Sequence, residues 1–280
     1  MKVLVTGAEG FIGKYVCKAL EDSKIEFCRG TRDNMNMADA EGMTRFLKQN
    51  RVSHIIHLAA FADNTDGKKL FDSNIAGWYR LLSAAKKSGV KYITFGGTNN
   101  VYGEGWQKRI PEDAPCSPAY DNEYALTKYI GELMIEDMLA DSEIKYSVMR
   151  ISDVYGPHQK HGNLIKAIVR AVKENDVIKL YGEGRRTRDY IYVTDVADGM
   201  VFATVNELEG VYNLSTGVGT SVKELVELAI KISNGRCVLE TVAVDKEDMS
   251  AIVLDSEKLR QAGFKAEITL EKGLCACIKE

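Results

Sequence analysis

Short apolar runs alternate with stretches of helical periodicity along the first half of the chain. The apolar runs predict strands, and they lie at residues 2–6, 25–28, 54–59, 92–95 and 146–149. Between them, apolar positions recur at helical spacing at residues 11–20, 74–88 and 122–139. Strands that alternate with helices in this way predict a parallel sheet with helices on both faces.

The pattern changes after the segment Tyr-Gly-Pro at residues 155–157. Periodicity then predicts a helix at residues 164–173, a strand at 178–181 and a later helix at 222–232. Three of the four prolines in the chain fall within residues 104–119, which predicts a long loop there. The change of rhythm indicates a second, smaller lobe, and no flexible linker separates it from the first.

Composition and charge narrow the class of protein. The 280-residue chain is 45% hydrophobic and 28% charged, which is typical of an ordinary folded protein. Its 37 basic and 40 acidic side chains leave no broad positive field, so we expect neither nucleic acid nor a membrane surface as a partner. The chain has no apolar run long enough for a bilayer span and no signal-peptide pattern at its start, which favours a cytoplasmic protein.

The cysteines and histidines predict no metal site. The six cysteines are irregularly spaced, which does not resemble a disulfide framework, and we expect them to be reduced. Cys275 and Cys277 lack a second ligand pair at zinc-site spacing. His54 and His57 lie in a predicted strand, where side chains three positions apart point to opposite faces.

Three glycines directly follow the first predicted strand. Gly7, Gly10 and Gly13 have the spacing GxxGxxG and lead into the first helix. There, backbone amides and the helix dipole can hold a pyrophosphate. A tight turn with a positive φ would also use glycine, but the placement between strand and helix favours a nucleotide site.

A tyrosine and a lysine share one face of the helix predicted at residues 122–139. Tyr124 and Lys128 are four residues apart, so the ammonium can lower the phenol pKa from its usual value of about 10. Such a phenol can exchange a proton with a carbonyl or an alcohol. The alternative is a surface pair on an amphipathic helix. Thr98 favours the catalytic interpretation, because it follows a strand at the sheet edge where open α/β folds bind ligands.

These motifs resemble those of the extended short-chain dehydrogenase/reductase family, the NAD-dependent epimerases, dehydratases and reductases that modify nucleotide sugars. The resemblance runs nearly end to end and includes residues 57–60 (HLAA), Asn74, Thr98, 101–103 (VYG), 150–157 (RISDVYGP), 181–184 (YGEG), 188–193 (RDYIYV), Asp195 and 212–217 (YNLSTG).

The resemblance implies a two-lobed α/β protein. A Rossmann domain with a doubly wound parallel sheet would comprise residues 1–155 and roughly 189–207. The smaller substrate-binding lobe would comprise residues 156–188 and 208–280 and would close over a nucleotide-diphosphate sugar. Family members usually pair through two long helices of each subunit, so a homodimer is also implied.

The resemblance also implies a role for individual residues. Tyr124 would be the acid/base, Lys128 would hold the nicotinamide ribose, and Thr98 would bind the reacting oxygen during hydride transfer at a sugar carbon such as C4. The implied cofactor-binding residues are Gly7, Gly10, Phe11, Ile12, Gly13, Arg29, Arg32, Asn36, Met37, Leu58, Ala59, Ala60, Asn74, Tyr124, Lys128 and Ile151. The implied substrate-binding residues are Asn99, Asn100, Asp153, Asn163 and Arg188. Arg188 would bind phosphate, unless it forms an ion pair with a neighbour such as Asp189.

At two places the sequence departs from the motifs of family members, and these differences narrow the range of reactions that the protein could catalyse. The 4,6-dehydratases carry Thr-Asp-Glu where this chain has Thr98-Asn99-Asn100, and amides cannot act as that acid and base. This disfavours 4,6-dehydration and the decarboxylating relatives. Galactose-type epimerases carry a lysine at the position of Ala62 and an asparagine at that of Asp153. A carboxylate facing a diphosphate is unfavourable, so the substrate pose and the nucleotide stay open.

Residues after the second strand bear on the cofactor. Arg29 and Arg32 lie where NAD-specific members place an acidic residue, which favours NADP over NAD. The segment 31–33, with Asn36 and Asp39, is similar to that of the NADPH-dependent GDP-fucose synthases, although Glu9 stands where they have an arginine.

Those enzymes use a histidine as a second acid, at a position that corresponds to Asn163. His158 or His161 could replace it, but a loop histidine is more often solvated surface.

The sequence leaves two mechanisms open. Two other classes of protein can be weighed against them. A reductase would release its cofactor after each turnover, whereas a 4-epimerase would keep NAD bound. A non-catalytic dinucleotide sensor could share the fold, but the intact Thr98, Tyr124 and Lys128 argue against it. A serine hydrolase is excluded, because the chain contains no Gly-x-Ser-x-Gly segment.

Overall fold

A six-stranded parallel sheet forms the centre of the molecule. The computed structural model describes residues 1–106, 109–159, 164–234 and 237–279. Its central strands lie in the order β2-β1-β3-β4-β5-β9, and all neighbouring pairs are parallel. These strands are β1 (Val3–Thr6), β2 (Phe27–Gly30), β3 (His54–His57), β4 (Tyr92–Gly96), β5 (Lys145–Ile151) and β9 (Gly210–Leu214). The order reverses between β1 and β3, and ligands of such sheets bind beyond the carboxyl ends of the strands at this point.

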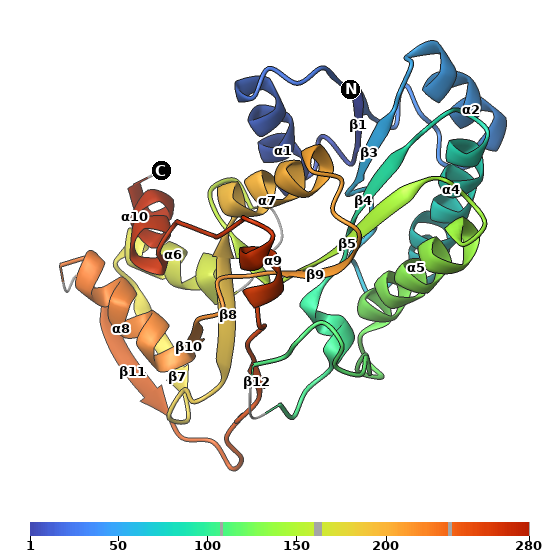
Figure 1. The fold of residues 1–280 in the computed structure, drawn as a ribbon. Helices are drawn as coiled ribbons and strands as arrows, with labels where there is room; N and C mark the ends of the chain where they lie inside the picture. Colours follow the sequence, from blue (N-terminus) through green and yellow to red (C-terminus); the bar gives the residue numbers. More distant parts are fainter. Residues whose placement is uncertain (107–108, 160–163, 235–236, 280) are drawn as a thin grey trace.

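Helices cover both faces of this sheet, as predicted (Figure 1). On one face, α1 (Phe11–Asp22) packs against α7 (Val193–Val205). The other face is covered by α2 (Ala40–Gln49), α4 (Trp78–Lys86) and α5 (Glu123–Leu139). α4 continues a helical segment that begins with α3 (Gly67–Leu70) and passes through the π-helical η1 (Phe71–Gly77).

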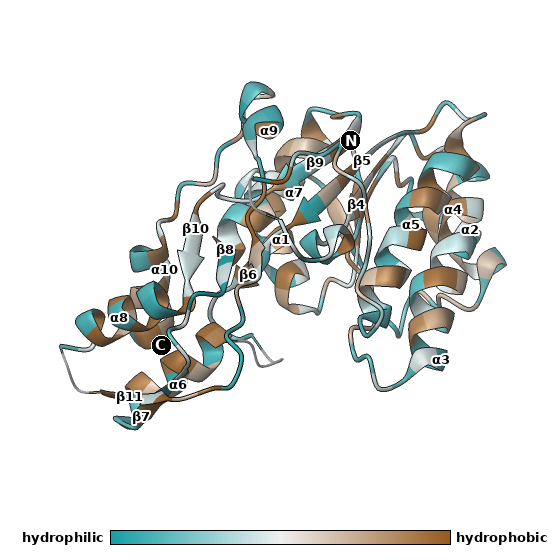
Figure 2. Cartoon of the chain, turned by 90° about the horizontal axis from the view of Figure 1, so that it is seen from below, coloured by the Kyte–Doolittle hydropathy of each residue, from teal (hydrophilic) through white to brown (hydrophobic). Residues whose placement is uncertain are grey.

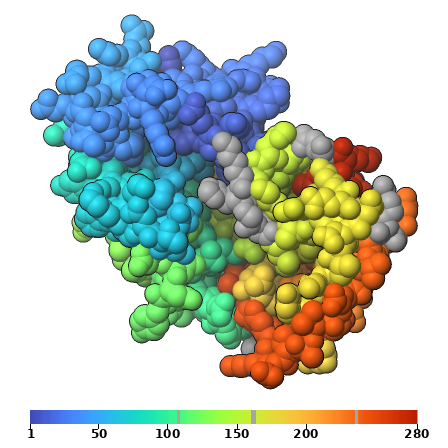
Figure 3. Space-filling model, turned by 180° about the vertical axis from the view of Figure 1, so that it is seen from behind, coloured from blue at the N-terminus to red at the C-terminus, as the bar shows by residue number. Residues whose placement is uncertain are grey.

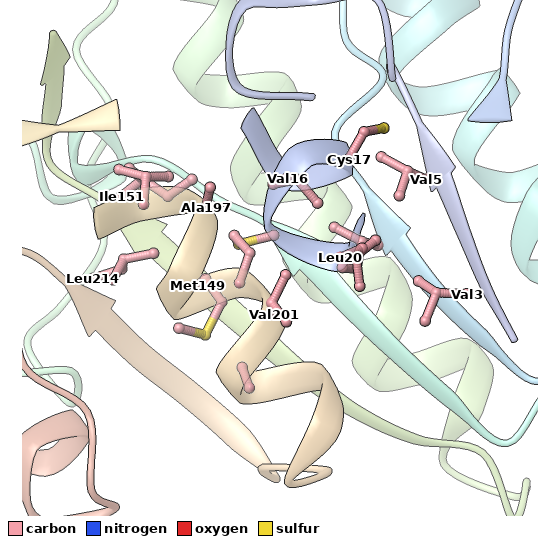
Figure 4. Packing of buried hydrophobic residues seen from close by; sticks show 14 of the residues in the cluster. Val3, Val5, Val16, Cys17, Leu20, Met149, Ile151, Ala197, Val201 and Leu214 are labelled. Atoms are coloured by element: carbon pink, nitrogen blue, oxygen red, sulfur yellow. The ribbon is translucent and has the colours of Figure 1, made fainter. Parts of the chain in front are cut away.

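The alternation of side chains along each strand fills a hydrophobic cluster on each face of the sheet. Val3 and Val5 pack in the cluster against α1 and α7, where Figure 4 shows Val16 and Val201 from the two helices facing them. Leu4, between the two valines, packs in the opposite cluster. This is the period-two pattern of a strand that is buried on both sides.

Two smaller sheets and several helices form the second lobe. One sheet contains β6 (Asp153–Tyr155), β8 (Thr187–Tyr192), β10 (Gly219–Ser221) and β12 (Ala251–Ile252), and the other pairs β7 (Val177–Tyr181) with β11 (Val238–Val242). The helices of this lobe are α6 (Leu164–Glu174), α8 (Val222–Ile232) and α10 (Leu270–Lys279), whereas α9 (Glu257–Gln261) packs against β9 of the central sheet. Figure 2 shows hydrophobic and hydrophilic bands alternating along α8, as expected of a helix buried on one side.

The structure differs from the expected division of the chain at β9. The family resemblance implies that residues 208–280 all belong to the smaller lobe, but Gly210–Leu214 is the sixth strand of the central sheet and pairs with β5. The reason is that α7 packs on α1 and returns the chain to the free edge of β5. A short apolar run does not by itself reveal which sheet it joins.

The described residues contain no helix with the length and apolar character of a membrane span. Nor do they contain a cluster of three or more side chains arranged to hold a metal ion. None of the six cysteines, all of which the structure describes, forms a disulfide.

Candidate functional site

The glycine turn after β1 contacts the loop that follows β3. Gly7 has a φ of +67°, and a Cβ there would lie 2.7 Å from the Ala59 amide nitrogen. A Cβ on Gly13 would lie 2.1 Å from the Gly7 carbonyl oxygen. Only glycine permits these two approaches, which bring the first turn of α1 against the end of β1.

The N-terminus of α1 has the features of an anion site. Its N-cap, Gly10, offers no side-chain acceptor, and the first turn contains no acidic residue. The first amides of a helix lack partners within the helix, and they attract negative charge. The turn and the helix therefore fit a dinucleotide diphosphate.

Thr6 holds the two loops together, a role that the sequence analysis missed. Its Oγ1 accepts hydrogen bonds from the amides of Leu58 and Ala59, both at 3.2 Å, and lies 2.8 Å from Nδ1 of His57. The structure thus brings together the glycine turn and Leu58 and Ala59, as expected of cofactor-binding residues. The only signal in the sequence was a threonine at the end of a strand beside glycine.

The two arginines after β2 differ in their surroundings. Arg29 donates to Oε1 of Glu21 at 3.1 Å, and its guanidinium lies 5.8 Å from the centre of the Phe27 ring. Arg32 is exposed and takes part in none of the ion pairs found among the described residues. Asn36 is also exposed, whereas Met37 packs against the hydrophobic cluster beneath α4. Arg29 is therefore partly neutralised, and Arg32 alone offers an unpaired positive charge at this point.

Helix α5 places Lys128 at the carboxyl end of β4. Asn122 caps the helix by accepting a hydrogen bond from the Ala125 amide, and the Tyr124 amide donates to Oδ1 of Asn64 at 2.8 Å. Lys128 lies one turn after Tyr124 and is only 3% exposed. Its ammonium lies 4.1 Å from the centre of the Phe95 ring, near the end of β4. The expected pair is therefore not a surface pair.

Burial controls the ionisation of both residues. It lowers the pKa of Lys128 to about 8, and the negative charge of Glu132 opposes this effect. Burial also raises the pKa of the Tyr124 phenol to about 12. We expected the ammonium to lower that pKa, but Lys128 is directed over Phe95, and in this state burial outweighs any such effect.

Thr98 begins a row of polar side chains between the central sheet and the smaller lobe. It precedes the 3₁₀ helix η2 (Asn99–Tyr102), which packs against α5, and its hydroxyl donates to Oδ1 of Asn99 at 3.3 Å. Nδ2 of Asn99 then donates to Oδ1 of Asp153 at 3.0 Å. Burial raises the pKa of the Asp153 carboxyl, while Asn99, Arg188 and Arg186 act in the opposite direction. Asn100, at the edge of the row, is half-buried.

Arg188 continues this row in β8. Its guanidinium donates to the carbonyl oxygens of Thr187 and Ser250 and to Oγ of Ser250, and it lies 3.6 Å from the Glu104 carboxylate. Asp189, the alternative partner weighed above, instead accepts hydrogen bonds from Thr216 and Gly217. Arg188 therefore forms an ion pair, as the alternative interpretation allowed, but its partner is Glu104 and not Asp189.

Asn74, expected to bind the cofactor, links two elements in the structure. Its Oδ1 accepts from the Phe61 amide at 2.7 Å, and its Nδ2 donates to the Phe61 carbonyl at 2.8 Å and to Oγ1 of Thr127 at 3.0 Å. These bonds tie the loop after β3 to α5. Asn74 thus holds Tyr124 and the loop of Ala59 and Ala60 in a fixed relation.

The remaining candidates lie around this centre. Phe11 and Ile12 are half-buried in the first turn of α1, and Ile151 ends β5 as a buried residue. His158 is exposed and lines a cavity of about 330 Å³ against α6, away from Thr98, Tyr124 and Lys128. Asn163 and His161 lie outside the described residues. Figure 3 shows the surface hollowed where the blue-to-green part of the chain meets the yellow part.

The fold and these residues define a class of protein. A doubly wound parallel sheet, a glycine turn at the first helix, and a buried lysine one turn after a tyrosine are the parts of a nicotinamide-dinucleotide enzyme. Residues 3–215 match the NAD dependent epimerase/dehydratase family. The chain belongs to this family, which confirms the extended short-chain dehydrogenase/reductase resemblance.

Relatives of known name cover almost the whole chain. It is 29% identical to a putative UDP-glucose 4-epimerase of Methanocaldococcus jannaschii, over 97% of this chain and 95% of that one. It is 24% identical to a mouse dTDP-D-glucose 4,6-dehydratase, over 98% of this chain and 86% of that one. Its fold is similar to that of Thermus thermophilus UDP-glucose 4-epimerase in complex with NAD, with a TM-score of 0.87, 27% identity and coverage of 100% and 98%.

Proposed function

We propose that the protein is a nucleotide-sugar 4-epimerase that keeps NAD bound and transfers hydride at C4 of the sugar. The observation that carries the proposal is the buried Lys128, which lies one helical turn after Tyr124 with its ammonium over Phe95, near the carboxyl end of β4. Relatives named as UDP-glucose 4-epimerases support the reaction. When bound, the nicotinamide supplies the acceptor and donor of the hydride.

The protein's own residues supply binding and proton transfer. The N-terminus of α1, which has no side-chain cap, would bind the diphosphate of the dinucleotide, and the Lys128 ammonium would donate to its ribose hydroxyls. Because the pKa of Tyr124 is about 12, its phenol is protonated at neutral pH and can donate to the sugar carbonyl. Oxidation of the alcohol requires the reverse transfer, which the nearby positive charge of Lys128 favours.

The row from Thr98 to Arg188 is the proposed substrate site. Arg188 is buried and its guanidinium lies 3.6 Å from the exposed Glu104 carboxylate, and a guanidinium suits the diphosphate of a sugar nucleotide, which would replace Glu104 as its anionic partner. Thr98 and Asn100 can bind sugar oxygens, and Asn99 is fixed by Asp153. The absence of acidic side chains at residues 99 and 100 argues against 4,6-dehydration, although a dehydratase is among the relatives.

A reductase that uses NADPH is the second candidate, and the exposed Arg32 favours it. Mass spectrometry of the small molecules released on denaturation distinguishes the two. Stoichiometric NAD supports the epimerase, because that enzyme retains its cofactor. An empty protein that binds NADPH more tightly than NADH would support the reductase and overturn the epimerase.

The Tyr124→Phe variant tests the proposed chemistry. Loss of the hydroxyl removes the acid/base group, so we expect interconversion of UDP-glucose and UDP-galactose to fall by about 10²–10⁴-fold. Bound dinucleotide should stay at the wild-type amount, because the phenyl ring preserves the packing. Tyr181→Phe, at an exposed tyrosine of β7, is the matched control. Full activity of Tyr124→Phe would contradict the proposed role.

A further inference from the structure

Three ionisable side chains follow one face of α5. Tyr124, Lys128 and Glu132 are spaced by four residues, so they occupy successive turns of the helix. Lys128 is 3% exposed and Glu132 is 5% exposed. The Lys128 ammonium lies over Phe95, and a Cβ on Gly97 would lie 3.0 Å from Oε1 of Glu132. Both charged groups therefore point to the last residues of β4.

The two oxygens of the Glu132 carboxylate have different surroundings. Oε2 accepts from Nε and an NH2 group of Arg150, at 3.0 Å and 2.8 Å. Oε1 is buried and has no hydrogen-bond partner within the part of the chain that the structure describes. A buried oxygen without a partner is costly unless a positive charge lies near it. The ammonium of Lys128, one turn away, supplies that charge.

Arg150 is fixed from a second direction. Its NH1 group donates to the Tyr102 hydroxyl at 2.9 Å and to the Glu112 carbonyl at 3.0 Å. The guanidinium therefore cannot follow Glu132 if the carboxylate moves. Arg150 anchors the carboxylate at one oxygen and leaves the other facing β4.

The groups around Lys128 can be named element by element. On its own helix, burial raises the pKa of Glu132, whereas the hydrogen bonds and charge of Arg150 and the charge of Lys128 act in the opposite direction and favour the carboxylate; Tyr124 is protonated at neutral pH. From β3, His57 is buried, and burial together with Lys128 holds its pKa well below the usual value, so it is neutral. From β4, the Phe95 ring faces the ammonium, and from β5, Arg150 reaches it only through Glu132. Glu132 is thus the negative charge that favours the protonated amine.

We propose that Glu132, anchored by Arg150, is a positioning residue that keeps the Lys128 ammonium charged at the end of β4. The role of the Lys128 ammonium in binding and proton transfer rests on the proposed function. Its protonation state does not, because it can be measured without substrate. Because Arg150 partly neutralises the Glu132 carboxylate, it also limits the effect of that carboxylate on the Lys128 pKa. Neither residue needs to touch substrate or cofactor for this effect.

Direct titration of Lys128 tests the proposal without substrate. In protein labelled with ¹⁵N-lysine, the Nζ resonance of Lys128 is assigned by its loss in Lys128→Met and is followed with pH. We expect Glu132→Gln to lower the Lys128 pKa by about one unit or more, because the amide keeps the shape but removes the charge. Glu132→Asp keeps the negative charge, so the Lys128 pKa should stay close to its wild-type value in this variant. Glu136→Gln, an exposed acid one turn further along α5, should leave the pKa unchanged.

For a second variant, we expect the Lys128 pKa to shift in the opposite direction. Arg150→Gln removes the counter-charge of the carboxylate, so the Lys128 pKa should rise over the pH range in which Glu132 is ionised, and the Glu132 carboxyl resonance followed in the same titration defines that range. A purely structural role of the pair would move the pKa in the same direction in both variants. An unchanged pKa in Glu132→Gln, or a fall in Arg150→Gln, would overturn the proposal. Either result leaves the assay of Tyr124→Phe, and with it the proposed function, unaffected.

Discussion

The buried lysine of α5 has a cost to stability that its proposed role explains. Desolvation lowers the folded-state pKa of Lys128 from 10.5 to about 8, which corresponds to about 3 kcal/mol. Below pH 8 both the folded and the unfolded states carry the ammonium, and only the folded state bears the desolvation. Between pH 8 and 10.5 the unfolded state holds the proton and the folded state does not, so stability rises with pH in that window.

Replacing this lysine should therefore stabilise the protein while removing its activity. We expect Lys128→Met to raise the free energy of unfolding at pH 7 by about 1–3 kcal/mol, because the lost contact with Phe95 offsets part of the gain. The advantage should shrink above pH 8. Urea unfolding at pH 7 and pH 9.5 measures it, with Lys48→Met on the exposed face of α2 as the control. A destabilised Lys128→Met protein would show that the ammonium is not strained by burial.

The joint between β1 and α1 is the element whose geometry depends most on glycine. A Cβ on Gly13 would lie 2.1 Å from the Gly7 carbonyl oxygen, and backbone would have to move to admit it. We expect Gly13→Ala to lower the free energy of unfolding by about 3 kcal/mol and to abolish retention of the dinucleotide. Gly10→Ala, whose Cβ would lie at 3.0 Å from the same oxygen, should cost less. Equal stability of the two variants in urea unfolding would contradict this account.

Periodicity predicted the elements because the inner strands of the central sheet are buried on both faces and most helices on one. The helix predicted at residues 222–232 is observed as Val222–Ile232. The strand predicted at 25–28 is observed as Phe27–Gly30, because the Ile25 amide donates to the Leu20 carbonyl and closes the end of α1. Lys24, with a φ of 55°, forms that turn. An apolar residue that caps a helix and one that begins a strand look alike in sequence.

Sequence patterns could not predict the contacts between distant residues that shape the candidate site. Thr98, Tyr124 and Lys128 could be proposed as site residues from the sequence because each lies in a local motif. The bond between Asn99 and Asp153 joins residues 54 positions apart, and Asp189 reaches Thr216 across 27 positions. Such pairs depend on how β6 and β8 meet the central sheet. The raised pKa of Tyr124 likewise depends on burial, which spacing along a helix does not reveal.

At the scale of the whole molecule, the described part of the chain leaves the outer face of the helices on one side of the sheet exposed. Phe71, Tyr79, Leu126 and Leu133 are each about half exposed there, on η1, α4 and α5. Leu126 and Leu133 are seven residues apart, so they lie on one stripe of α5. α4 and α5 pack against each other (Figure 1). Exposed apolar patches of this kind mark interfaces, and a twofold axis through the patch would create a four-helix bundle.

We therefore expect a homodimer that is formed through α4 and α5. Leu133→Glu would place a charge on each side of the twofold axis, and we expect it to weaken dimerisation by about 100-fold or more. Val238→Glu is the matched control, because Val238 is also exposed but belongs to β11 at the other end of the molecule (Figure 1). Sedimentation velocity at micromolar concentration measures both. A monomeric wild-type protein would remove the prediction, whereas a dimer that only Leu133→Glu dissociates would place the interface on these helices, on the opposite face of α5 from Lys128.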